Sequence, residues 1–159
     1  MQIFRPFESH EQSAMYLDNR RLSKQVLELY QIIRVCLAEM NIIEGNTRYL
    51  SHPIVKHIYH EGHPFLPDAL HFLHACDVEH QRRGGNRNEA FRNDLLRLSE
   101  LIEHHYHSFD DKRIPPFYVY GDVKVYGEDV YGLYRELLHQ KWLDDQIAPR
   151  CGVSLTAKR

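Results

Sequence analysis

The residues best placed to do chemistry lie in one stretch near the N-terminus, Leu17–Glu28, which reads Leu-Asp-Asn-Arg-Arg-Leu-Ser-Lys-Gln-Val-Leu-Glu. In a helix, residues three and four positions apart are neighbours, so Glu28 would lie among Arg21, Lys24 and Gln25. A carboxylate held among cations on a rigid helix is suited to general acid–base work. The alternative is a solvated helix face on which Lys24 and Glu28 form an ordinary ion pair, worth roughly a few tenths of a kcal/mol.

A long helix from about Asp18 to Met40 would hold this stretch in place. Apolar residues recur along it at spacings of three and four positions, which is the pattern of one buried helix face. They are Leu22, Val26, Leu29, Ile33, Leu37 and Met40. The apolar face would anchor the helix, while Glu28 and the basic residues fall on its other faces.

Other segments also predict helices. Ser9 and Gln12 have the spacing of a capping box, so a short helix is expected to start near His10. The run Ser51-His52-Pro53 suits another helix start, because proline is favoured in the first helical turn. Three further helices are expected at about 67–83, where Gly84-Gly85 follows, at 91–105 and at 128–146.

The last of these helices has a predicted inner line of Val130, Leu133, Leu137 and possibly Lys141. Before it, residues 108–127 hold two adjacent prolines, two glycines and several aromatic residues. Part of this segment, 119–127, could form a small hairpin, and a long irregular loop is an equal alternative. The sequence therefore predicts an all-α fold: a single compact domain of about five to six helices over residues 1–150, with an aromatic Pro/Gly-rich loop before the last helix and a tail at 151–159.

The overall charge limits the kinds of partner. The net charge is −2 with histidines neutral and the isoelectric point is about 6.6, which argues against a generally basic nucleic-acid binder but allows a local basic patch. No apolar run approaches a membrane span, and the N-terminus lacks the apolar segment of a signal peptide. We therefore expect no membrane partner and a cytoplasmic location. The three cysteines show no metal-type pairing and are expected to be thiols.

Basic residues gather in three places that could contact phosphate. The first lies in the long helix, the second surrounds the Gly-Gly turn, and the third precedes the aromatic loop. Solvated helix ends would explain these clusters equally well. The candidate residues are Arg20, Arg21 and Lys24; Arg82, Arg83 and Arg87; and Lys112 and Arg113.

The twelve histidines raise the separate possibility of a metal centre. His52, His57, His60 and His63 fall within twelve residues, and His57 and His60 are three positions apart, which is a workable ligand spacing on a helix. No known metal signature is present, neither His-Glu-x-x-His nor Cys-x-x-Cys. Surface and helix-packing histidines are the favoured interpretation, so no metal and no other cofactor is expected.

Three motifs in the first half of the chain resemble a known family. The segment Leu17–Glu28 matches the pattern Leu-Asp-x-x-Arg-Leu-x-Lys-Gln-x-x-Glu, 51–55 resembles a His-Pro-x-Val segment, and 70–84 resembles a helix that ends in Arg-Gly. Together they resemble the pyrimidine-dimer DNA glycosylases, the family that includes the phage enzyme called endonuclease V. From about residue 86 onward the likeness is faint.

The resemblance implies an all-helical enzyme that flips a base out of duplex DNA and cuts its glycosidic bond. In that family the protein's α-amino group attacks C1′ and forms a Schiff base, a glutamate assists, and β-elimination then nicks the strand. By position, the glutamate corresponds to Glu28. Gln2 is bulky and would keep the initiator in place, so the amine would belong to Met1. An α-amine has an ordinary pKa of about 7.7–8.0, which leaves a useful fraction neutral.

The expected function is thus a DNA glycosylase with associated AP lyase activity that excises a damaged or modified pyrimidine from double-stranded DNA. The expected catalytic residues are Met1 and Glu28, and a monomer is expected. A non-catalytic DNA- or protein-binding module on the same fold is the first alternative, and a histidine-based metal hydrolase is the second. The residues expected to contact DNA are Arg5, Arg20, Arg21, Lys24, Gln25, Arg82, Arg83, Arg87, Lys112 and Arg113.

Overall fold

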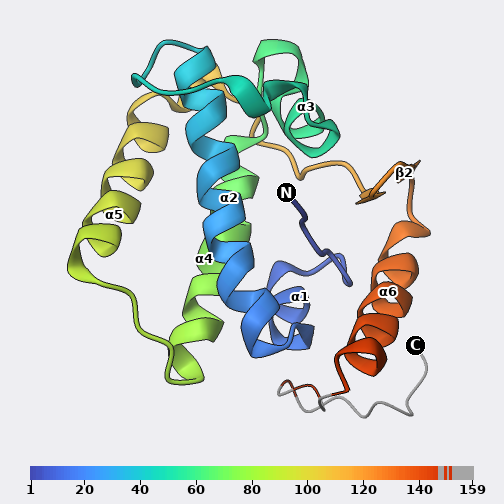
Figure 1. Cartoon of the computed structure of the whole chain (residues 1–159). Coiled ribbons are helices and arrows are strands. Elements are labelled where there is room, and N and C mark those ends of the chain that lie inside the picture. The colour runs from blue at the N-terminus through green and yellow to red at the C-terminus, as the bar shows by residue number, and fades with distance from the viewer. Residues whose placement is uncertain (147–148, 150, 152–159) are drawn as a thin grey trace.

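The computed structural model describes residues 1–146, 149 and 151, so all of the predicted tail except Cys151 lies outside the described residues. The described chain contains six α-helices, three short 3-10 turns and one β-hairpin. Figure 1 shows α2 in front of α4 at the centre, α5 and α6 on opposite sides, and α3 at one end. The α-helices are α1 His10–Tyr16, α2 Asn19–Glu39, α3 Pro53–Tyr59, α4 Leu66–Arg82, α5 Glu89–His104 and α6 Val130–Asp145.

The helix starts follow the capping residues that the sequence offers. Ser9 accepts a hydrogen bond from the Gln12 N–H at 3.1 Å, which confirms the expected start of α1. Asp18 caps α2, and Asn88 caps α5 by accepting from the Phe91 N–H. A cap satisfies one of the amides that a helix start leaves unpaired. These polar side chains therefore fix where the helices begin, and the turn at Gly84 (φ +92°) follows the end of α4.

The aromatic segment forms a hairpin, so the all-α expectation is only partly confirmed: the described chain is mainly helical and contains a small sheet. Strands β1 Phe117–Tyr120 and β2 Val123–Tyr126 pair antiparallel, with Phe117 opposite Tyr126. The β-branched and aromatic residues favour extended backbone, and Gly121 adopts φ +56° in the turn. β1 also packs on α6, where the Val119 N–H donates to the Tyr134 hydroxyl at 3.1 Å.

The inner line predicted for α6 is wrong by one residue. Leu133 and Leu137 are only partly buried, whereas the residues that follow each of them are fully buried. Tyr134 and Trp142 carry the buried face, and each uses its polar atom in the interior, the indole N–H of Trp142 donating to Asp18 at 2.8 Å. The pattern of leucines alone missed this face because large aromatic residues supply most of its area. The buried residues of α6 are Val130, Tyr134, Leu138 and Trp142.

The basic cluster at the end of α4 closes the joint between α1 and α2. The Arg83 guanidinium donates to the backbone carbonyls of Met15 and Leu17, at 3.0 and 2.6 Å, and to the carboxylate of Glu79. These contacts satisfy carbonyls that the end of α1 leaves unpaired. The neighbouring Arg82 pairs with the same carboxylate, but its side chain is 68% exposed, against 10% for Arg83. No helix in the described part of the chain is long and apolar enough to cross a membrane.

We expect Arg83→Ala to lower the free energy of unfolding by about 2–3 kcal/mol, because it removes charge-assisted hydrogen bonds and leaves carbonyls without donors. The matched variant Arg82→Ala should have a much smaller effect, since that guanidinium is exposed. Urea unfolding of both variants followed by circular dichroism measures the difference. Equal losses of stability would show that Arg83 does not close this joint.

Candidate active site around the N-terminus

The N-terminal segment runs in extended form beside α2, and one buried amide holds it there. The Gln25 side chain accepts from the Phe4 N–H at 2.7 Å and donates to the Phe4 carbonyl at 2.9 Å. The Gln25 side chain thus satisfies both backbone groups of Phe4, as the backbone of a neighbouring strand would in a β-sheet. Gln25 is 1% exposed, so both bonds are shielded from water. The contact fixes the register of residues 1–4 against α2.

The chain end itself lies in the middle of the molecule, between α2, α3 and the hairpin (Figure 1). Gln2 ties it to the hairpin, since its side-chain amide donates to the Val119 carbonyl at 2.8 Å. On the other side lies His52, whose pKa is lowered by burial and then by the positive charges of the N-terminal amine and Lys124. The α-amine is thus positioned at a defined place rather than on a free chain end.

The sequence names His52 only among the histidines of a possible metal centre and within the 51–55 segment, and predicts no catalytic role for it. Its Nδ1 accepts from the Ile54 N–H at 3.2 Å and caps α3, so the neutral ring carries its proton on Nε2. A neutral imidazole near the amine can donate a hydrogen bond without adding charge. The signal in the sequence was the Ser51-His52-Pro53 helix start, which located the residue but gave no reason to place the amine beside it.

Glu28 lies on the same flank of α2 as Gln25, three residues further along the helix and half-buried. Residues 1–7 run antiparallel to α2 (Figure 1), so the chain from Phe4 back to Met1 leads along the helix in the direction of Glu28. Among the described residues, Glu28 has no hydrogen-bond or ion-pair partner, which leaves its carboxylate available. The contact at Gln25 thus directs the N-terminal segment along the helix that carries Glu28.

Two arginines at the start of α2, of which Arg21 was expected beside Glu28, are occupied elsewhere. Arg20 and Arg21 both pair with Asp145 of α6 at 2.9 Å, and Arg21 also binds the capping Asp18. These bonds tie α6 to the start of α2. Lys24 is exposed on the helix surface. The predicted cluster around Glu28 therefore divides into a structural joint and one exposed lysine.

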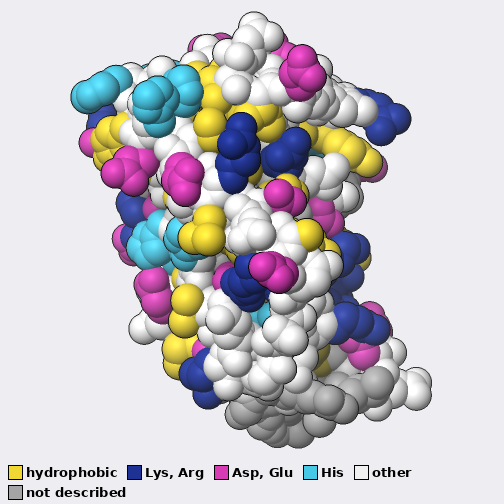
Figure 2. Space-filling view, turned by 90° about the vertical axis from the view of Figure 1, so that its left-hand side faces the viewer, with side chains coloured by type: hydrophobic (Ala, Val, Ile, Leu, Met, Phe, Trp, Pro, Cys, Tyr) yellow, Lys and Arg dark blue, Asp and Glu magenta, His cyan; other side chains and the backbone are white. Residues whose placement is uncertain are grey.

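The remaining residues expected to contact DNA are spread over the molecule. Arg5 is 1% exposed and donates to the Ile114 carbonyl at 2.8 Å. Arg87 donates to the Ser23 carbonyl at 2.6 Å, and Arg113 binds the Glu8 carbonyl and Asp68. These guanidinium groups hold segments of the chain together. Figure 2 shows the face turned toward α5, where acidic and basic side chains are interspersed and histidines gather near the upper edge.

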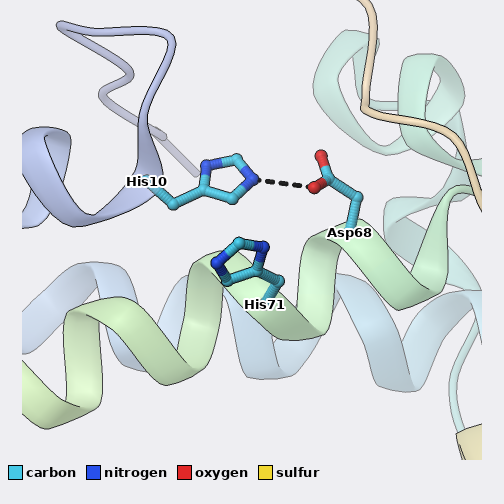
Figure 3. A group of neighbouring side chains, drawn as sticks. All are labelled: His10, Asp68 and His71. Carbon is cyan, nitrogen blue, oxygen red and sulfur yellow. Dashed lines mark hydrogen bonds and ion pairs between the residues drawn. The ribbon is translucent and has the colours of Figure 1, made fainter.

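One group of side chains within the described residues has the spacing of a metal site: His10, Asp68 and His71 (Figure 3). It does not include the histidine pairs of 52–63. His10 Nε2 bonds Asp68 Oδ1 at 2.9 Å, and its ring stacks on Phe72 with centroids 4.4 Å apart. His71 bonds Glu11 at 2.8 Å. The cluster links α1 to α4.

The surroundings of this cluster favour a hydrogen-bonded joint over a cation site. Asp68 also accepts from the Ile114 N–H at 2.8 Å and from Arg113 at 3.3 Å. Burial lowers the pKa of His10, and the positive charges of Arg5 and Arg113 lower it further. A metal ion would have to displace these donors and tolerate two guanidinium groups. The geometry therefore assigns Asp68 to holding the 113–114 segment and α1 against α4.

The His10–Asp68 joint should make the fold sensitive to acid. Burial lowers the pKa of His10 from its ordinary value of 6.5. Below pH 6.5 the unfolded chain then binds more protons than the folded one, so stability is present above this pH and falls as the pH decreases. The contribution of His10 to the slope is at most about 1.4 kcal/mol per pH unit.

We expect the free energy of unfolding of the wild type to fall more steeply between pH 7 and pH 5.5 than that of His10→Gln, which keeps a donor for Asp68 but cannot titrate. Urea denaturation at a series of pH values measures both slopes. Identical slopes would mean that His10 does not take up a proton more readily in the unfolded chain than in the folded one.

Comparison with known proteins gives one match. A family model described as pyrimidine dimer DNA glycosylase matches residues 1–93, which is more than half of the chain. No curated protein and no solved structure matches. The matched span contains Met1, Glu28 and His52, and it ends in the first turns of α5. The hairpin and α6 lie beyond it.

Proposed function

Because the chain belongs to the pyrimidine dimer DNA glycosylase family, we propose that it excises a damaged or modified pyrimidine through a Schiff base on the α-amine of Met1, with Glu28 assisting. The observation that carries this proposal is the anchored N-terminus. Gln25 and Gln2 hold residues 1–4 between α2 and β1, and the positive charge of the amine lowers the pKa of His52. A nucleophile must be positioned to gain the rate advantage of an intramolecular reaction.

The proposed reaction begins when the neutral amine attacks C1′ of the flipped nucleotide. The bond between C1′ and the base breaks, and the base leaves with the electron pair and takes a proton. The amine then loses a proton, the C1′–O4′ bond opens with O4′ protonated, and a C=N bond joins Met1 to the sugar. Loss of a proton from C2′ breaks the C3′–O3′ bond and nicks the strand.

Glu28 is suited to move the protons in this scheme, because it is half-buried and lies three residues beyond Gln25, which holds the N-terminal segment against α2. As an acid it would protonate O4′, and as a base it would take the C2′ proton. His52 offers an Nε2–H that can donate to the sugar or to a neighbouring phosphate. Its lowered pKa keeps the ring neutral at physiological pH, so it donates without becoming a second cation beside the amine.

Borohydride trapping tests the covalent step directly. We expect the wild type, incubated with a duplex that carries an abasic site, to give a stable protein–DNA adduct on reduction. Peptide mapping should place the adduct on the peptide that contains Met1. A parallel duplex with a thymine dimer tells whether that lesion is the substrate. An adduct on a lysine, or no adduct from folded protein, would contradict the proposed nucleophile; salt-dependent DNA binding without an adduct would favour a binding module.

Glu28→Gln should keep the fold and DNA affinity and lose base release by at least about a hundredfold, since general acid–base catalysis contributes roughly 10²–10⁴ in rate. The matched control is Glu39→Gln, which removes an exposed carboxylate from the end of the same helix and should retain activity. Single-turnover base release and thermal melting measure the two properties. Normal base release by Glu28→Gln would remove this residue from the mechanism.

A further inference from the structure

Strand β2 is unusually exposed for a strand in a folded domain. Its four residues all face solvent, whereas the first three of β1 are buried. Three of them are large and apolar: Val123 is 52% exposed, Val125 37% and Tyr126 53%. An exposed apolar patch of this kind marks a site of interaction. Nothing in the described chain covers this outer strand.

The hairpin also forms one wall of an open cleft of about 860 Å³, whose other wall is α3 and the preceding turn η1 Arg48–Ser51. Three cations line this cleft, namely Arg48, Lys56 and Lys124, against one acidic residue, Glu61. Within the described residues, neither lysine forms an ion pair. A protein with net charge −2 thus has a locally basic cleft with two unpaired ammonium groups.

A second large cleft, of about 690 Å³, has the opposite character. Its lining includes Arg113 and Arg135 but also Glu8, Glu128 and Asp129, so acidic residues are in excess. Both arginines donate to backbone carbonyls, Arg135 to that of Pro6 at 2.6 Å. An anion would gain little there. Of these two clefts, the one beside the hairpin is therefore the one suited to phosphate.

The basic cleft lies next to the N-terminal amine. The cleft is lined by Ser51 and Pro53, which flank His52 in the sequence. The charges of the amine and of Lys124 both lower the pKa of His52. On its other side Tyr126 packs near His57, with ring centroids 5.2 Å apart, and leaves more than half of its own surface in solvent. A strand that passes the amine would therefore meet two lysines and an exposed aromatic ring.

We propose that β2 and the cleft between it and α3 bind the DNA strand that flanks the reacting nucleotide, with Lys56 and Lys124 on its phosphates and Tyr126 against a base. This inference rests on the proposed function, because it takes the Met1 amine as the reacting group. A two-stranded ribbon fits a DNA groove, and an exposed aromatic residue can stack on an unpaired base. The hairpin lies outside the family match, so the proposal adds a contact beyond the matched residues.

The test separates DNA binding from chemistry. Fluorescence anisotropy with a labelled duplex carrying a tetrahydrofuran abasic analogue, which cannot form a Schiff base, gives affinity as a function of salt. We expect the double variant Lys56→Ala/Lys124→Ala to bind at least tenfold more weakly at about 0.1 M salt and to show a salt slope reduced by about two, one for each lost phosphate contact. The control is Arg97→Ala, an exposed cation on α5, which should leave the slope unchanged.

The aromatic contact has its own pair of variants. Tyr126→Ala should weaken binding about tenfold, and Tyr126→Phe, which retains the ring and its packing near His57, should restore it. Weak binding by both variants would indicate a role of the hydroxyl or damage to the hairpin and would overturn the stacking contact.

Borohydride trapping at saturating DNA distinguishes the two ideas. A wild-type adduct on Met1, together with unchanged affinity and salt slope in Lys56→Ala/Lys124→Ala, overturns the cleft proposal and leaves the chemistry intact. Absence of a wild-type adduct contradicts the chemistry, while a reduced salt slope in the double variant would still locate the DNA in the cleft.

Discussion

The arrangement around the N-terminus depends on one interaction, the two hydrogen bonds between the Gln25 side chain and the backbone of Phe4. A chain end normally gains little from folding, because its few residues cannot repay the entropy of being ordered. Here a buried amide replaces water for both polar groups of Phe4, and the apolar side chains of Ile3 and Phe4 enter the core beside it. The terminus is therefore held against α2, as the proposed nucleophilic amine would require.

The helical part of the fold could be predicted because short-range rules determine it. Ser9 caps α1 where its spacing to Gln12 predicts a helix start, α2 begins directly after Asp18 as expected, and the apolar stripe of α2 lies in the core. The sequence of residues 119–127 fits a hairpin and an irregular loop equally well, since four-residue strands carry a weak periodic signal. The predicted inner line of α6 is wrong because Tyr134 and Trp142 fill the core while their polar atoms find partners inside it.

The candidate site could be predicted only in part, for a different reason. The motif of Leu17–Glu28 identified the helix and Glu28, but a sequence does not state which cations are already paired. Arg21 binds Asp145, which lies more than a hundred positions further along the chain, as well as the nearby Asp18. Arg83 binds backbone carbonyls at the end of α1. Long-range partners of this kind depend on the assembled fold. Lys56 and Lys124 are far apart in the sequence and become a pair only where α3 and the hairpin face one another across the cleft.

Among the described residues, the arginines and the lysines of the basic cleft have different roles. The buried and half-buried arginines use their several donors to join helices, which suits the planar guanidinium group. The unpaired lysines stay solvated and can exchange water and counterions for phosphate at little structural cost. Under the proposed mechanism, a mildly acidic protein would hold DNA with a few well-placed ammonium groups beside the amine of Met1. Because so few contacts would be made, its affinity should depend on the exposed ribbon of β2 as much as on charge, and lesions that loosen base stacking would offer that ribbon the unpaired base it needs.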